Sequence, residues 1–124
     1  MLALDVLIVD DHEPMRAMLR KLLERAGVDG VRDAASSKEA LKLMQERSPQ
    51  LMLVDQTMPE MDGLTLVMHA RADPSCAETR IIMLTGRADT VHVETARQAG
   101  VNALLVKPVA PSELLAAIER VFSA

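Results

Sequence analysis

The sequence predicts an α/β fold in which five β-α units build a parallel sheet with helices on both faces. Short apolar runs rich in Val, Ile and Leu alternate with longer stretches whose apolar residues recur at helical spacing. The 124 residues are enough for one ordinary domain, and 49% of them are hydrophobic, which is sufficient for a core. Alternating units of this size imply right-handed crossover connections between parallel strands.

The first unit begins with a continuous apolar run at residues 6–9, as expected of a strand buried on both faces. Pro14 is predicted to begin the first helix and Gly27 to end it. The helical spacing of its apolar residues places Met15, Met18, Leu19, Leu22 and Leu23 on one face of this helix. A weaker strand is predicted at residues 30–34.

The second and third units carry clear boundary signals. Ser36 and Glu39 have the spacing of a capping box, which predicts the start of a second helix that ends before Pro49. The third strand is predicted at residues 51–54, and a loop leads from it to a helix at about residues 64–72.

The last two units follow the same pattern. Residues 81–84 form the fourth predicted strand and residues 102–106 the fifth. Gly100 closes the fourth helix, and Pro111 begins the last one. The fourth helix carries Val91, Val93 and Ala96. The predicted inner face of the last helix consists of Leu114, Leu115, Ile118, Val121 and Phe122.

Composition and charge exclude several classes of protein. The net charge of −4 argues against a general electrostatic attraction to nucleic acid or to an anionic membrane. Cys76 is the single cysteine, so an intrachain disulfide is impossible. This cysteine content is consistent with a protein of a reducing compartment. The N-terminus lacks the features of a signal peptide, and no segment reaches membrane-spanning length. We therefore expect a cytoplasmic protein that has neither nucleic acid nor a membrane as its partner.

Polar residues follow four of the five predicted strands. Asp10 and Asp11 follow the first strand, Asp55 the third, Thr85 the fourth and Lys107 the fifth. Ligands of open α/β sheets bind at the carboxyl ends of the strands, where the strand order reverses. The second strand has no comparable residue at its end, as expected if it lies at the edge of the sheet.

Each of these residues alone has an ordinary structural explanation, such as a helix cap, a turn or a solvated lysine. Their combination is more informative, because carboxylates brought together repel one another and are costly to bury without partners. Mg²⁺ relieves this repulsion and prefers a few carboxylates together with waters and a phosphate oxygen. A nucleophile, a metal, a cation and a hydroxyl donor are the groups needed to handle a phosphoryl group.

Four motifs carry a resemblance to a known family. They are VDD at Val9–Asp11, DQTMPEMDG at Asp55–Gly63, LTG at Leu84–Gly86 and VKP at Val106–Pro108. In order and spacing they resemble the receiver domain of two-component response regulators of bacterial signalling, in its single-domain, chemotaxis-type form. The resemblance covers residues 1–124 as one receiver domain with no output domain. It implies the flavodoxin-like, doubly wound fold with strand order 2-1-3-4-5.

The resemblance also implies roles for individual residues. Asp55 would be the phosphoacceptor, taking phosphate from a histidine kinase or a histidine phosphotransfer protein. Mg²⁺, or Mn²⁺ as a substitute, would be bound by Asp11 directly, by Asp10 largely through water, by Asp55, and by the backbone carbonyl of Thr57.

Two further residues of the predicted site would act on the phosphoryl group itself. Lys107 would pair with the phosphoryl oxygens, and a cis Lys107-Pro108 bond would aim it inward. Thr85 would move to donate a hydrogen bond to the new phosphate. Phosphorylation would change the affinity of the fourth helix, fifth strand and fifth helix for an unidentified target protein. The chain would be a monomer or a weak dimer. It would not be an enzyme, and would promote only its own phosphorylation and dephosphorylation.

The sequence departs from the family at Leu104, where many receivers carry an aromatic residue three positions before the lysine. A leucine cannot provide the usual coupling to the threonine, so we expect a smaller or differently located conformational change. Thr57 and Arg87 flank the phosphate in this family and are predicted to set the lifetime of the phosphoryl group. Arg87 could instead pair with Glu60 or Asp89, or be solvated.

Two other functions remain open on the sequence alone. A receiver fold could serve as a phosphorylation-independent protein-interaction module, and Leu104 is the single hint for this. A small α/β enzyme is the other alternative, but no glycine-rich phosphate loop follows the first strand, and flavin stacking would lack aromatic residues. The three histidines, His12, His69 and His92, have no metal-ligand spacing.

Overall fold

The computed structural model describes residues 3–86 and 89–123. Across these residues the chain forms a five-stranded parallel sheet in the order β2-β1-β3-β4-β5. The strands are β1 (Asp5–Val9), β2 (Gly30–Ala34), β3 (Leu51–Asp55), β4 (Arg80–Thr85) and β5 (Ala103–Val106). The helices are α1 (Glu13–Arg25), α2 (Ser37–Glu46), α3 (Gly63–Ala72), the short 3-10 helix η1 (Pro74–Cys76), α4 (Thr90–Ala99) and α5 (Pro111–Phe122). The predicted fold class and strand order are confirmed.

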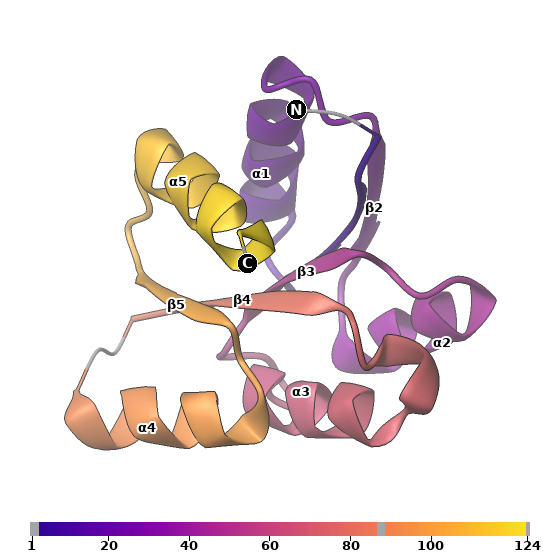
Figure 1. Cartoon of the computed structure of the whole chain (residues 1–124), viewed down its shortest axis with the longest axis vertical. Helices are drawn as coiled ribbons and strands as arrows, with labels where there is room; N and C mark the ends of the chain where they lie inside the picture. The colour runs from indigo at the N-terminus through magenta and orange to yellow at the C-terminus, as the bar shows by residue number, and fades with distance from the viewer. Residues whose placement is uncertain (1–2, 87–88, 124) are drawn as a thin grey trace.

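The sheet separates two hydrophobic cores, because helices cover both of its faces. Helices α1 and α5 lie on one face, and α2, α3 and α4 lie on the other (Figure 1). Successive residues of β1 serve opposite faces: Val6 and Ile8 pack toward α1 and α5, whereas Leu7 and Val9 pack toward α2 and α3. The strands are continuous apolar runs in the sequence because both faces of the sheet are buried.

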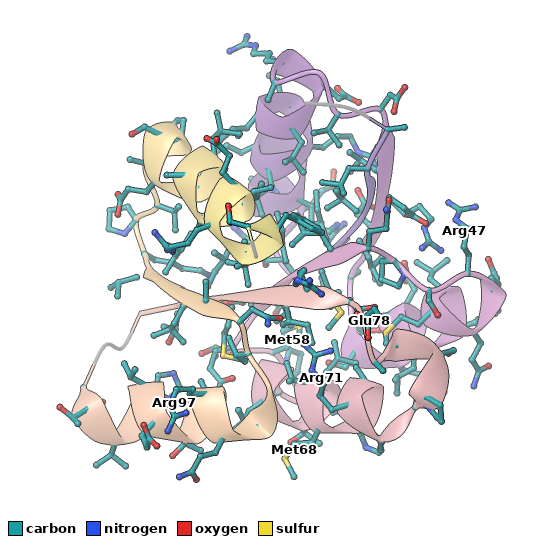
Figure 2. All side chains as sticks on the ribbon, viewed as in Figure 1. Arg47, Met58, Met68, Arg71, Glu78 and Arg97 are labelled. Atoms are coloured by element: carbon teal, nitrogen blue, oxygen red, sulfur yellow. The ribbon has the colours of Figure 1, made fainter. Side chains whose placement is uncertain are left out.

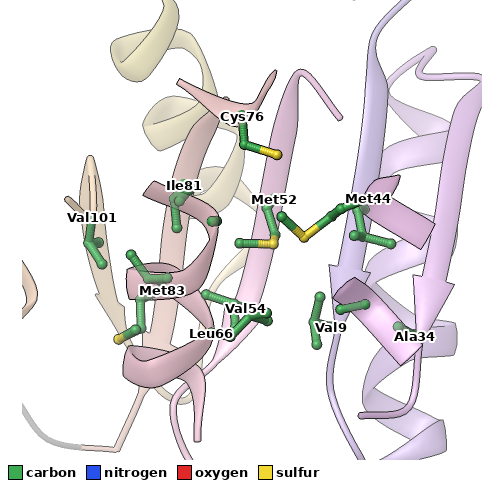
Figure 3. Packing of buried hydrophobic residues seen from close by; sticks show 14 of the residues in the cluster. Val9, Ala34, Met44, Met52, Val54, Leu66, Cys76, Ile81, Met83 and Val101 are labelled. Atoms are coloured by element: carbon green, nitrogen blue, oxygen red, sulfur yellow. The ribbon is translucent and has the colours of Figure 1, made fainter. Parts of the chain in front are cut away.

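Methionines occupy much of the core beneath α2 and α3. Met44, Met52 and Met83 lie among aliphatic side chains there (Figure 3), and each is at most 3% exposed. The chain has a single aromatic residue, Phe122, so flexible thioether side chains fill volume that aromatic rings would otherwise take. Met68 of α3, by contrast, points away from the sheet into solvent (Figure 2).

Two residues of the predicted apolar helix faces are exposed. In α1, Leu19 and Leu23 are buried but Met18 is 48% exposed, because it lies at the edge of the apolar stripe beside α5. Phe122 at the end of α5 is 40% exposed, and the Arg80 guanidinium lies over its ring at 5.7 Å from the centroid. The prediction that Phe122 belongs to the inner face of the last helix was therefore wrong.

Helix α4 packs against the sheet with a face that contains a histidine. Val91 and Val93 are 76% and 40% exposed, whereas His92 and Ala96 are buried. Residues 92 and 96 are one helical turn apart and share a face, and the two valines flanking His92 point to either side of it. This orientation places a histidine, not a valine, against the end of the neighbouring strand.

A half-buried arginine holds together the end of the sheet at which β4 and β5 begin. The Arg71 guanidinium donates to the carbonyls of Gly100 and Cys76 at 2.9 and 3.1 Å and to Oδ1 of Asn102 at 2.9 Å. Arg71 lies between α3 and the sheet, and Arg97 lies out on α4 (Figure 2). Arg71 thus ties the end of α3 to η1 and to the α4–β5 turn. No helix in the described part of the chain is long and apolar enough to cross a membrane.

Candidate functional site

Three carboxylates converge at the carboxyl ends of β1 and β3. One oxygen each from Asp10, Asp11 and Asp55 can be chosen so that all three lie within 4.8 Å of one another. The two strands are neighbours, with Val9 paired to Val54, so the residues that follow them must meet. β1 pairs with β2 on one side and with β3 on the other, which makes this the switch point of the sheet.

Asp10 is the most deeply buried of these acids, at 1% exposure. Its Oδ1 accepts a hydrogen bond from the backbone N–H of His12 at 2.8 Å, and its Oδ2 has no hydrogen-bond partner among the described residues. Burial raises the pKa of Asp10 above its ordinary value, and the nearby charges of Asp55 and Asp11 raise it further. A buried carboxylate oxygen without a partner, beside two other carboxylates, is the arrangement that a hard divalent cation fits.

Asp55 is 5% exposed and is paired with the lysine that follows β5. Nζ of Lys107 donates to Oδ1 of Asp55 at 2.7 Å. The backbone N–H of Lys107 donates to the carbonyl of Thr85 at 2.7 Å, so β4 and β5 remain joined up to the residue that enters the site. The Lys107-Pro108 peptide bond is cis. Lys107 thus forms a close ion pair with one of the three clustered carboxylates.

The loop from β3 to α3 folds back tightly against Asp55. A Cβ added at Gly63 would lie 2.4 Å from the Asp55 carbonyl oxygen, so this position excludes a side chain. Oε1 of Gln56 accepts from the backbone N–H of Leu64 at 2.9 Å, and Asp62 caps α3 by accepting from the N–H of Thr65. Thr57 is exposed in this loop, two residues after Asp55.

Thr85 ends β4 and contacts a residue that the sequence reasoning missed. Its Oγ1 lies 3.3 Å from Nε2 of His92, and both side chains are buried, at 2% and 8% exposure. Asp89, the N-cap of α4, accepts from the backbone N–H of His92 at 2.9 Å and fixes the start of the helix. The spacing of His92 and Ala96, four residues apart, was the sequence signal that could have placed the imidazole on the inner face.

The remaining predicted positions lie around this centre. Leu104 pairs with Met83 in the β4–β5 register and packs, half-buried, against the core beneath α3 and α4, near Ala96 and Val101. Glu60 is exposed and adopts a left-handed backbone with φ of 68°. Arg87 lies outside the described residues, and the prediction that it shields the phosphate or pairs with an acid stays a prediction.

Several known proteins resemble this chain in sequence and in structure. A sequence model described as "Response regulator receiver domain" matches residues 6–119. The chain is 35% identical to a probable chemotaxis protein CheY of Rhizobium etli over 96% of its own length and 92% of that protein. It is 39% identical to the chemotaxis protein CheY1 of Helicobacter pylori over 92% and 93% of the two chains. The solved structure of the chemotaxis response regulator CheY4 of Vibrio cholerae superposes with a TM-score of 0.91 at 32% identity, covering 97% of this chain and 99% of that one.

Proposed function

Since the chain belongs to the response regulator receiver domain family, we propose that it is a phosphorylation switch with Asp55 as the phosphoacceptor. Receiver domains are signalling modules rather than enzymes that turn over a separate substrate. The observation that carries the proposal is the pairing of Lys107 at 2.7 Å with Asp55, which lies together with Asp10 and Asp11. A nucleophilic carboxylate, a cation and a site for a divalent metal thereby adjoin one another.

The acidic cluster supports a Mg²⁺ site, for which Mn²⁺ could substitute. Asp10, Asp11 and Asp55 would hold the ion together with the backbone carbonyl of Thr57. When bound, the ion supplies positive charge to the oxygens of the transferring phosphoryl group and relieves the repulsion among the carboxylates. The unpartnered Oδ2 of Asp10 supports this assignment, because a buried carboxylate oxygen needs a proton or a cation as partner.

The donor is proposed to be a phosphohistidine of a histidine kinase or a histidine phosphotransfer protein. A carboxylate oxygen of Asp55 forms the new P–O bond as the P–N bond of the donor breaks, and that bond's electron pair leaves with the imidazole. Nζ of Lys107 is already at Asp55 and can follow the developing charge on the phosphoryl oxygens. The hydroxyl of Thr85 is proposed to donate to a phosphoryl oxygen after transfer.

The surface of α4, β5 and α5 is proposed to report the phosphorylation state to a target protein. Val91, Val93 and Val106 are large apolar residues with 76%, 40% and 41% exposure on α4 and β5. Exposed apolar side chains of this kind favour contact with another protein. The target must bind the phosphorylated and unphosphorylated states with different affinity for the switch to transmit a signal.

A phosphorylation-independent interaction module is the second candidate. Leu104 favours it, because the residue cannot respond to Thr85 through a hydroxyl or an aromatic ring. Three carboxylates kept together, one of them buried with an unpartnered oxygen, weigh against it, because a constitutive binding surface does not require them.

The proposed function is tested by phosphoryl uptake in the intact protein. The chain is incubated with acetyl phosphate, with Mg²⁺ or with a chelator, and its mass is measured. We expect the mass gain of a single phosphoryl group only when Mg²⁺ is present, and peptide mapping should place it on Asp55. No uptake, or uptake at a residue other than Asp55, would contradict the proposal.

A further inference from the structure

We propose that His92 couples the phosphorylation site to α4, taking the place of the aromatic residue that position 104 lacks. In the unphosphorylated state the imidazole is hydrogen-bonded to the Thr85 hydroxyl, and phosphorylation at Asp55 breaks this bond. The inference rests on the proposed function, because it requires Thr85 to move toward a phosphoryl group on Asp55. His92 is a positioning residue, since it acts through Thr85.

The first reason is the placement of His92. Its Nε2 lies 3.3 Å from Oγ1 of Thr85, and both residues are buried, so the contact joins the end of β4 directly to the first turn of α4. The backbone of His92 is held by the Asp89 cap. Because its backbone is held in this way, His92 cannot move freely with the Thr85 hydroxyl. Its ring therefore loses the hydrogen bond when the hydroxyl moves toward Asp55.

The second reason is the limited range of this contact. An oxygen and a nitrogen 3.3 Å apart are already near the outer limit of a hydrogen bond. Even a short displacement of the Thr85 hydroxyl toward Asp55 takes the two atoms out of range. The imidazole nitrogen is then left buried without the Thr85 hydroxyl, and the first turn of α4 must move to restore a partner to it.

The third reason is that the other route for the signal, through position 104, has no polar group. Leu104 lies half-buried in the core beneath α3 and α4 and has no polar atom with which to sense the hydroxyl. Val91 and Val93, in contrast, flank His92 in the sequence and are exposed. A rotation of the first turn of α4 therefore changes the apolar surface that these two valines present, and the signal leaves through α4 rather than β5.

The test compares His92→Leu with His92→Gln and with the control His69→Leu. Leucine keeps apolar volume but removes the hydrogen bond, whereas glutamine places an amide near the position of Nε2. His69 is an exposed histidine on α3, whereas Thr85 is buried at the end of β4. Two-dimensional amide NMR spectra are recorded for each protein during a titration with beryllofluoride, a phosphoryl analogue, at saturating Mg²⁺.

In the wild type we expect shifts in the loop after Asp55 and across residues 90–99. His92→Leu should keep the loop shifts, but its α4 shifts should fall to less than about half. Its half-saturating beryllofluoride concentration should fall about fivefold, which corresponds to about 1 kcal/mol, because a bond broken on activation is already absent. His92→Gln should restore the wild-type α4 response, and His69→Leu should match the wild type throughout.

The outcomes separate this inference from the proposed function. Loop shifts together with undiminished α4 shifts in His92→Leu would overturn the coupling role of His92 and leave the phosphorylation site intact. A wild type without any response at the Asp55 loop would overturn both. If His92→Leu does not fold, the His92 ring-nitrogen resonances of the wild type decide: they should move on adding beryllofluoride, and an unchanged ring would refute the inference.

Discussion

Replacing Asp55 with asparagine is expected to abolish phosphoryl uptake, with a fall in rate of roughly a hundredfold or more. The carboxylate that attacks phosphorus is lost, and an amide oxygen is a far weaker nucleophile. Lys107 also loses the charged oxygen that it contacts at 2.7 Å. The rate is measured by intact mass with acetyl phosphate and Mg²⁺, under the conditions that phosphorylate the wild type.

Asp62→Asn is the matched control for this substitution. Asp62 lies in the same loop and caps α3 through the N–H of Thr65, a role that asparagine also fills. Its uptake should equal that of the wild type. Undiminished phosphorylation of Asp55→Asn would show that another group accepts the phosphate and that Asp55 is not the phosphoacceptor.

Asp10→Asn is expected to stabilise the metal-free protein by roughly 1 kcal/mol or more. The substitution removes a buried charge whose Oδ2 has no hydrogen-bond partner among the described residues and which lies beside Asp11 and Asp55. The same substitution should abolish most of the stabilisation by saturating Mg²⁺ that the wild type gains, because a proposed ligand is lost. Far-ultraviolet circular dichroism follows unfolding in urea, since the chain has no tryptophan.

The pH dependence of this effect follows from the direction of the pKa shift. Burial raises the pKa of Asp10 in the folded state, so between the ordinary and the raised pKa the folded protein binds more protons than the unfolded one. The contribution of Asp10 to the free energy of unfolding therefore falls as the pH rises through this interval, and stays low above it. The stability gained by Asp10→Asn in the absence of Mg²⁺ should grow over the same interval.

Asp29→Asn controls for the change in net charge, because Asp29 is exposed at the turn before β2. It should leave both the stability and the effect of Mg²⁺ close to those of the wild type. A metal-free Asp10→Asn that is less stable than the wild type, or one that Mg²⁺ stabilises equally, would contradict the assignment of Asp10 as a metal-binding carboxylate.

The fold could be predicted from the sequence because burial on both faces imposes continuous apolar strands. The run at residues 6–9 lies in β1, and the weak pattern at residues 30–34 coincides with the edge strand β2. The meeting of Asp10 and Asp55 was likewise predictable, because neighbouring parallel strands end at the same edge of the sheet.

Helix orientation was harder to predict, because a short helix gives few periods from which to find its inner face. In α4 the sequence marked apolar residues, Val91, Val93 and Ala96, but no inner face. The structure buries Ala96 together with His92. The contact of His92 with Thr85 joins residues of different elements. The spacing of His92 and Ala96 could therefore indicate the inner face of α4, but not the partner of the imidazole. Phe122 illustrates the same limit: as the last residue of α5 it reaches past the core and stacks under Arg80.

The central claim is tested most directly by two-dimensional amide NMR of the wild type and of Asp55→Asn, each with Mg²⁺, before and after beryllofluoride is added. A phosphoryl switch predicts wild-type shifts at Asp55, Thr85 and Lys107 that extend into α4, and none of these in the variant. A wild-type spectrum that neither Mg²⁺ nor beryllofluoride changes would contradict the account. The chain would then be a receiver fold that binds its partners independently of phosphate.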